Sequence, residues 1–117
     1  MTDHTALISS LEKATEGSRE LDALVWEALG AAVKRDHART KYAIRGDLPW
    51  GWTDRWQHML YVTTSVDDVA YLIGRTCPGR FTALLAQSAH ATSGRALALA
   101  LCIALLQALQ HQGGGNG

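Results

Sequence analysis

The chain of 117 residues lacks most of the features that usually reveal a protein's chemistry. It has two cysteines, Cys77 and Cys102, and two cysteines at this spacing form no metal-binding motif. Eleven basic residues balance eleven acidic ones, so the net charge gives no general reason to expect nucleic acid or an anionic membrane as a partner. We expect a single cytoplasmic domain with reduced thiols.

Catalytic and cofactor motifs are also missing. The sequence contains no GxGxxG or P-loop for phosphate and no GxSxG for a nucleophilic serine. Asp67 and Asp68 are adjacent, so on a helix they diverge and suit capping better than acid–base catalysis. The histidines are scattered without the spacing of metal ligands. We therefore predict no catalytic residue, no metal and no cofactor.

The longest hydrophobic segment, RALALALCIALLQALQ, lies at 95–110 and predicts a helix over 93–110, capped at Thr92–Ser93 and stopped by the glycines from Gly113. Its apolar core of eleven residues is shorter than the roughly 20 that a membrane span requires, and we expect no membrane association. Because it is apolar nearly all round, this helix must be covered on at least two sides. Its alanine row, at positions 96, 100 and 104, suits a neighbouring helix or a second copy of the chain.

Hydrophobic periodicity and turn residues predict further elements. Helices are expected at 5–15 with Thr5 as cap, from Ser18 to a stop at Gly30, and from a Thr64 or Ser65 cap to Gly74. Strands are expected at 57–62 and 80–87, and 45–52 reads as a loop. Residues 31–42 either prolong the second helix or form a short one.

The resulting order, α-α-β-α-β-α, predicts an α+β domain with alpha-beta-alpha layers, a small sheet and a buried C-terminal helix. This single domain spans 1–112, and 113–117 form a flexible glycine-rich tail. Two strands make a poor sheet, so either a third strand lies within 38–50 or a second subunit completes the sheet.

Three segments, at 14–30, 61–73 and 91–109, resemble the small "ABA sandwich" proteins of tailed bacteriophages and prophages. The first carries Gly-Ser-Arg-Glu-Leu-Asp at 17–22, the second Tyr-Val-Thr-Thr-Ser-Val-Asp at 61–67, and the third Ala-Thr at 91–92 with the helix from Ala96 to Cys102. Ser93 stands where that family has proline, and the strand-rich section before the third segment is shorter here. The resemblance implies an alpha-beta-alpha fold and a phage or prophage protein in the cytoplasm of a bacterial host. It implies no activity.

The candidate functional residues lie in the middle of the chain. They are basic residues followed by tryptophans: Lys34, Arg35, Arg39, Lys41, Arg45, Trp50, Trp52 and Trp56. Cations beside aromatic rings suit single-stranded nucleic acid. The same pattern is typical of a solvated strip next to packed tryptophans, and zero net charge favours that interpretation over nucleic acid. Exposed Trp and Arg are also typical anchors of protein interfaces.

For a small phage protein, we rank a protein interface above nucleic acid. The prediction is a non-enzymatic phage or prophage accessory protein that acts through protein–protein interaction. Its partner would be a second copy (a homodimer), a phage component, or a host factor, as for an inhibitor of host defence. The alternative is a nucleic-acid-binding module that uses residues 34–56.

Overall fold

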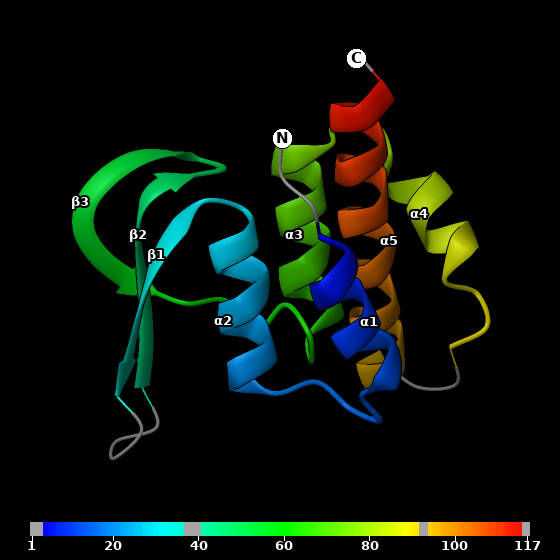
Figure 1. The fold of residues 1–117 in the computed structure, drawn as a ribbon, viewed down its shortest axis with the longest axis horizontal. Coiled ribbons are helices and arrows are strands. Elements are labelled where there is room, and N and C mark those ends of the chain that lie inside the picture. Colours follow the sequence, from blue (N-terminus) through cyan, green and yellow to red (C-terminus); the bar gives the residue numbers. More distant parts are fainter. Residues whose placement is uncertain (1–3, 37–40, 92–93, 116–117) are drawn as a thin grey trace.

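Helices both precede and follow a small sheet in the computed structural model, which describes residues 4–36, 41–91 and 94–115. Within this part of the chain the elements are α1 (Thr5–Lys13), α2 (Arg19–Ala28), β1 (Ala31–Asp36), β2 (Lys41–Leu48), β3 (Gly51–His58), α3 (Val66–Thr76), α4 (Phe81–Gln87) and α5 (Gly94–Gly115) (Figure 1). The predicted α+β class, with a small sheet and a buried C-terminal helix, is confirmed.

The sheet consists of consecutive antiparallel strands in the order β1-β2-β3. Val33 lies opposite Ile44, and Ala43 lies opposite His58. Ile44 and Leu48 are buried, and α2 packs against β1 and β2. The third strand, β2, falls within 38–50, where one alternative of the sequence analysis placed it, so the sheet reaches three strands within one chain.

Several boundaries in the first half of the chain correct the sequence prediction. Residues 31–36 form a strand instead of prolonging α2, because Gly30 adopts a φ of 100° and turns the chain away from the helix axis. The expected loop at 45–52 is largely strand, with only Pro49 and Trp50 between β2 and β3. The strand expected at 57–62 lies earlier, and β3 ends at His58.

In the second half, the strand expected at 80–87 is wrong, because Phe81–Gln87 forms the helix α4. Ser18 and Ser65 cap α2 and α3 as predicted: their hydroxyls accept from the N–H groups of Leu21 at 3.1 Å and Asp68 at 3.3 Å. The predicted Thr5 cap is wrong, since the cap position of α1 is His4.

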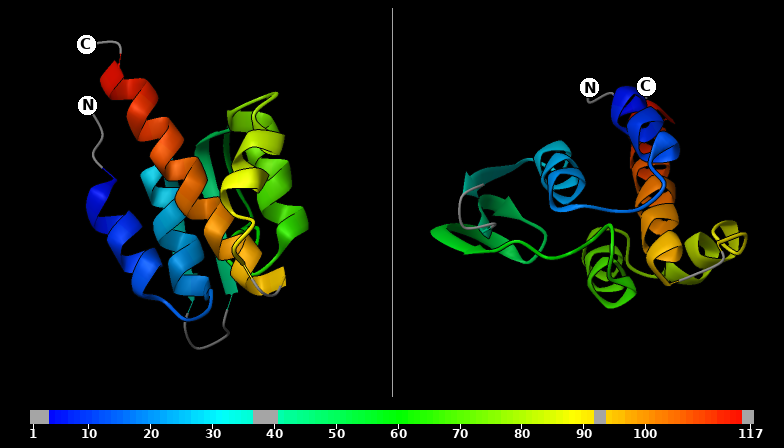
Figure 2. Two further views of the ribbon diagram at one scale, coloured as in Figure 1. Left: turned by 90° about the vertical axis from the view of Figure 1, so that its right-hand side faces the viewer. Right: turned by 90° about the horizontal axis from the view of Figure 1, so that it is seen from below.

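The C-terminal helix α5 is the centre of the helical part. It contacts α1, α3 and α4, and Leu101, Leu105 and Leu106 along it are fully buried. Figure 2 shows α5 running diagonally, with α1 on one side and α3 and α4 on the other. The cover that its apolar surface demands therefore comes from helices.

The C-terminal ends of two predicted helices also shift. The helix α5 continues to Gly115, past the stop expected at Gly113, and its predicted cap, Thr92–Ser93, lies outside the described residues. Similarly, α3 passes Gly74 and ends at Thr76. None of the helices in the described part of the chain meets the length and hydrophobicity of a membrane span.

The start of α2 packs tightly on the segment between β3 and α3. A Cβ atom at Gly17 would lie 2.0 Å from the carbonyl oxygen of Thr63, which is far inside van der Waals contact. No flexible side chain could move aside there, because the obstruction is backbone. Only glycine permits this approach.

We predict that Gly17→Ala lowers the free energy of unfolding by about 1–3 kcal/mol or more, because the two backbones must separate. The matched control is Gly74→Ala within α3, where an added Cβ meets nothing within 4 Å. Alanine should stabilise that helix by roughly 0.5–1 kcal/mol. Urea unfolding of both variants measures the difference, and equal stability would contradict the close approach.

Candidate interaction surface

One face of the sheet carries exposed basic and aromatic side chains. Alternation along the strands turns these residues away from the buried Ile44 and Leu48, because successive side chains on a strand point to opposite faces. Trp52 is 72% exposed and Trp56 39% exposed. We name this surface the outer sheet face and define it by Lys34, Lys41, Arg45, Trp52, Trp56 and His58.

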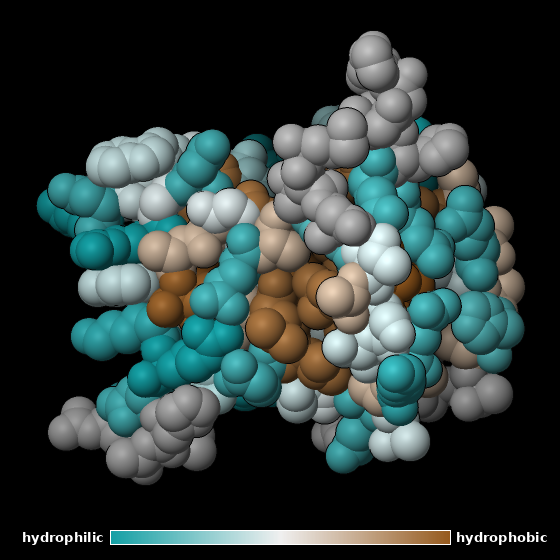
Figure 3. Space-filling view, viewed as in Figure 1, coloured by the Kyte–Doolittle hydropathy of each residue, from teal (hydrophilic) through white to brown (hydrophobic). Residues whose placement is uncertain are grey.

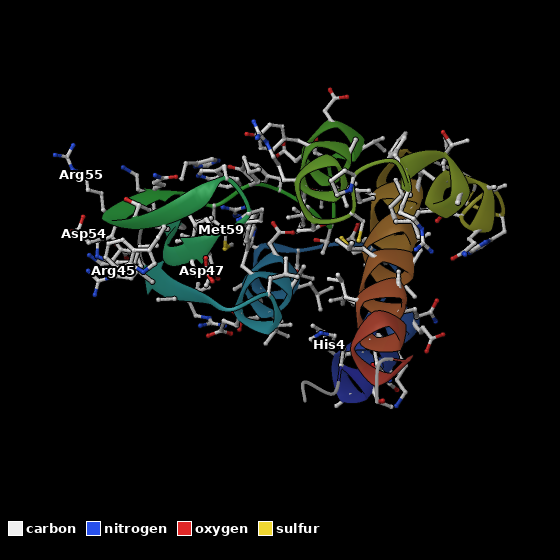
Figure 4. The ribbon with its side chains drawn as sticks, turned by 90° about the horizontal axis from the view of Figure 1, so that it is seen from above. His4, Arg45, Asp47, Asp54, Arg55 and Met59 are labelled. Carbon is white, nitrogen blue, oxygen red and sulfur yellow. The ribbon has the colours of Figure 1, made fainter. Side chains whose placement is uncertain are left out.

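The outer sheet face lies away from the helices. In Figure 3 hydrophilic side chains gather over the sheet, whereas hydrophobic ones show near α1 and α2. Figure 4 shows Arg45, Asp54 and Arg55 at the end of the sheet that is remote from the helices, and Met59 between the sheet and the helices. The pairing register shifts between Ile44 and Gly46, which gives β3 two extra residues without exchanging the two faces.

Cations are held against the ring of Trp56. The guanidinium carbon of Arg45 lies 4.3 Å from its ring centroid, and the Nζ atom of Lys34 lies 5.8 Å from it. Both distances fall within the range of cation–π attraction, which is worth about 0.5–1 kcal/mol at exposed sites. These contacts orient Trp56 while leaving part of the ring accessible.

Arg35, one of the predicted site residues, faces the opposite way. Its guanidinium forms salt bridges with Glu20 at 3.1 Å and Glu27 at 2.8 Å, both on α2. These hydrogen bonds raise the pKa of Arg35 and lower the pKa of Glu27. Arg35 therefore fastens α2 to the sheet.

Trp50 is also separated from the outer sheet face. Its indole N–H donates to Gln57 Oε1 at 3.1 Å, and its ring packs edge-on against Trp26 with the centroids 5.7 Å apart. The ring of Tyr71 lies 5.8 Å away on another side. Arg39 lies outside the described residues. The structure thus brings together Lys34, Lys41, Arg45, Trp52 and Trp56, and it assigns Arg35 and Trp50 to packing.

Three further residues border the same region and were not singled out from the sequence. The Arg19 guanidinium carbon lies 3.9 Å from the Tyr61 ring centroid and 5.5 Å from that of Tyr42. With Lys34, Lys41 and Trp56 these residues line a pocket of about 490 Å³. Arg19 belongs to the segment 17–22, which by itself indicated only the start of a helix.

Arg19 is fixed by a buried polar cluster, which we name the Asp22 junction and define as Ser18, Arg19, Asp22 and Thr63. Asp22 is fully buried and accepts from the Thr63 N–H and from Arg19, both at 2.8 Å. Arg19 also donates to the carbonyl oxygen of Met59 at 2.6 Å. The junction therefore ties α2 to the segment that follows β3.

The Thr63 hydroxyl has one proton and two acceptors within reach. Its oxygen lies 2.5 Å from Asp22 Oδ1 and 3.1 Å from the Ser18 carbonyl oxygen, and it accepts from the Ser18 N–H at 3.0 Å. A protonated Asp22 would satisfy both acceptors, because it would donate to Thr63 and free that hydroxyl for Ser18. Burial raises the pKa of Asp22, and the bonds from Thr63 and Arg19 offset this only in part.

Both thiols are free and buried, which agrees with the reduced cysteine expected at Cys102. The Cys102 thiol donates to the Val62 carbonyl oxygen at 3.0 Å, and burial, together with the Asp22 charge, raises its pKa. Within the described residues, no three His, Cys, Asp or Glu side chains are grouped so as to hold a metal ion. Asp68 accepts from the Tyr61 N–H at 2.7 Å, a structural use of its carboxylate.

We predict that wild-type protein loses stability relative to Asp22→Asn as the pH rises above the ordinary aspartate value of 3.8. With the pKa raised in the folded state, that state binds more protons than the unfolded chain in this range, so the free energy of unfolding falls with increasing pH. Asparagine does not titrate. Urea unfolding of both proteins from about pH 4 to pH 8 measures the difference. A difference that grows in favour of wild type would show that Thr63 and Arg19 dominate over burial.

Comparisons with known proteins identify no relative: no protein-family model, no curated protein and no solved structure matches this chain.

Proposed function

We propose that this is a non-enzymatic protein that acts by binding a protein partner through the outer sheet face. The observation that carries the proposal is the exposure of Trp52 and Trp56 on a face that also presents Arg45. Trp, Tyr and Arg supply most of the binding energy at protein interfaces, and a tryptophan left in water is otherwise an unused hydrophobic surface.

The charges on this face favour a protein partner over nucleic acid. Acidic residues are interspersed with the cations, with Asp36 and Asp47 on the strands that carry Lys34 and Arg45. The carboxylates in this mixture weaken the attraction of the cations for a phosphate backbone, and the zero net charge of the chain adds no attraction. A nucleic-acid-binding module using 34–56 is the second candidate, because Trp52 and Trp56 could stack bases.

A phage or prophage accessory role for this protein rests on the resemblance of 14–30, 61–73 and 91–109 to the "ABA sandwich" proteins. Under that proposal the partner is another phage component, a second copy of the chain, or a host factor, including a component of host defence. Affinity capture from phage-infected cells, with light scattering for self-association, would identify it.

We predict that Trp52→Ala and Trp56→Ala each abolish capture of the partner. The free energy of unfolding should change by less than about 1 kcal/mol for Trp52→Ala and by about 1–2 kcal/mol for Trp56→Ala, which loses its contacts with Lys34 and Arg45. The matched control is Trp50→Ala, which should cost about 2 kcal/mol or more because Trp50 packs against Trp26 and Tyr71. Affinity capture and urea unfolding are both needed. If the Trp52 and Trp56 variants capture the partner as well as wild type does, the proposal is wrong.

A further inference from the structure

We propose that the pocket beside Trp56 receives an acidic segment of the protein partner, in which a carboxylate adjoins a hydrophobic side chain. This inference rests on the proposed function and names the partner's chemistry. The observation behind it is one cavity lined by the rings of Tyr42, Trp56 and Tyr61 and by two lysines, Lys34 and Lys41.

The pocket lies where β3 leaves the sheet. Pairing with β3 ends at Ala43 opposite His58, whereas β2 begins two residues earlier, at Lys41. The notch beside Lys41 and Tyr42 encloses about 490 Å³. That volume falls within the roughly 300–1,000 Å³ of ligand pockets, so it has room for a few side chains.

The hydrophobic walls of the pocket are held in place before any partner arrives. Tyr61 stacks on the guanidinium of Arg19, and Tyr42 lies on the same group at a longer distance. Arg19 is itself fixed by Asp22 and by the Met59 and Leu60 carbonyl oxygens. Since Arg19 donates three hydrogen bonds inside the protein, it acts as a wall, and binding would require little ordering of this side of the pocket.

The charge available to a ligand therefore comes from Lys34 and Lys41. Both are exposed, and in the part of the chain that the structure describes neither forms a salt bridge. Two ammonium groups at the rim of an aromatic cavity match one or two carboxylates whose neighbouring side chain enters the cavity.

A carboxylate fits the local charges better than a row of phosphates does. Asp36 lines the same pocket, and Asp47 follows on the outer side of β2. Asp36 lies opposite Lys41 in the strand register, so every incoming anion meets this carboxylate. A peptide brings one or two acidic groups to this mixture of charges, whereas a nucleic-acid backbone would bring several further negative charges close to Asp36.

An array of short peptides tests the inference directly. Each peptide places Asp, Glu, Asn or Gln beside one hydrophobic residue, and binding of the full-length protein is measured. We expect the acidic members to bind about tenfold more tightly than their amide counterparts, with affinity falling as salt increases. Lys34→Glu and Lys41→Glu should each weaken binding of the acidic members about tenfold. Lys13→Glu, on α1, makes the same charge change away from the pocket and should leave binding unchanged.

Three results would overturn the inference: equal binding of acidic and amide peptides, equal effects of the three lysine variants, or tighter binding of an oligothymidylate than of any acidic peptide at the same salt concentration. The last result would assign the pocket to nucleic acid. Once a partner is known, the proposed function is tested separately. If Trp52→Ala and Trp56→Ala abolish binding of the partner while Lys34→Glu and Lys41→Glu do not, the outer sheet face is the binding surface and the inference of an acidic segment in the pocket is wrong.

Discussion

The buried carboxyl group of Asp22 holds the helical part and the sheet part of this structure together. It is fully enclosed, and it reaches the segment between β3 and α3 through both the amide and the hydroxyl of Thr63. A buried ionisable group that loses one partner costs about 3–5 kcal/mol, so such a group tolerates little movement of its neighbours. The helix α2 and residues 59–63 are consequently held as one unit. The indole N–H of Trp26 strengthens this unit by donating to the Leu60 carbonyl oxygen at 3.4 Å.

The candidate surface is built on the exposed side of that unit. Arg19 forms a salt bridge with Asp22 through one guanidinium nitrogen, and the flat surface of the same guanidinium lies over the rings of Tyr61 and Tyr42. The same side chain thus belongs to the buried junction and to the wall of the pocket. On the other face of the sheet from Lys34, Arg35 pairs with Glu20 and Glu27, which fixes the strands against α2. Rigid strands and fixed rings are what a preorganised binding surface requires.

The parts of the fold that could be predicted from the sequence are those with a strong local signal. The apolar helix at 95–110 and the serine caps at 18 and 65 fall into this class. The strands could not be read because β3, GWTDRWQH, has none of the alternation between apolar and polar residues that indicates a half-buried strand, and it is exposed along most of its length. The run at 80–87 is short and apolar, a pattern that suits a strand or a helix equally.

The sequence predicted the candidate site only as the segment 34–56. The strand register is what shows which residues of that segment share a face of the sheet. Lys34 and Arg35 are neighbours in sequence, yet they lie on opposite faces of β1, and no composition argument could separate them. Arg19 and Tyr61 join the site through tertiary contact alone. The segments 14–30, 61–73 and 91–109 also meet beside the site: Ser18 and Asp22 of the first bond Thr63 of the second, and Cys102 of the third donates to Val62.

A double-mutant cycle tests whether the contact between Asp22 and Thr63 holds α2 to the segment after β3. Urea unfolding would be measured for wild type, Asp22→Ala, Thr63→Val and the double variant. We expect a coupling energy of about 1–3 kcal/mol, because either substitution alone leaves a buried polar group without its partner. Additive effects of the two substitutions, within about 0.5 kcal/mol, would contradict it.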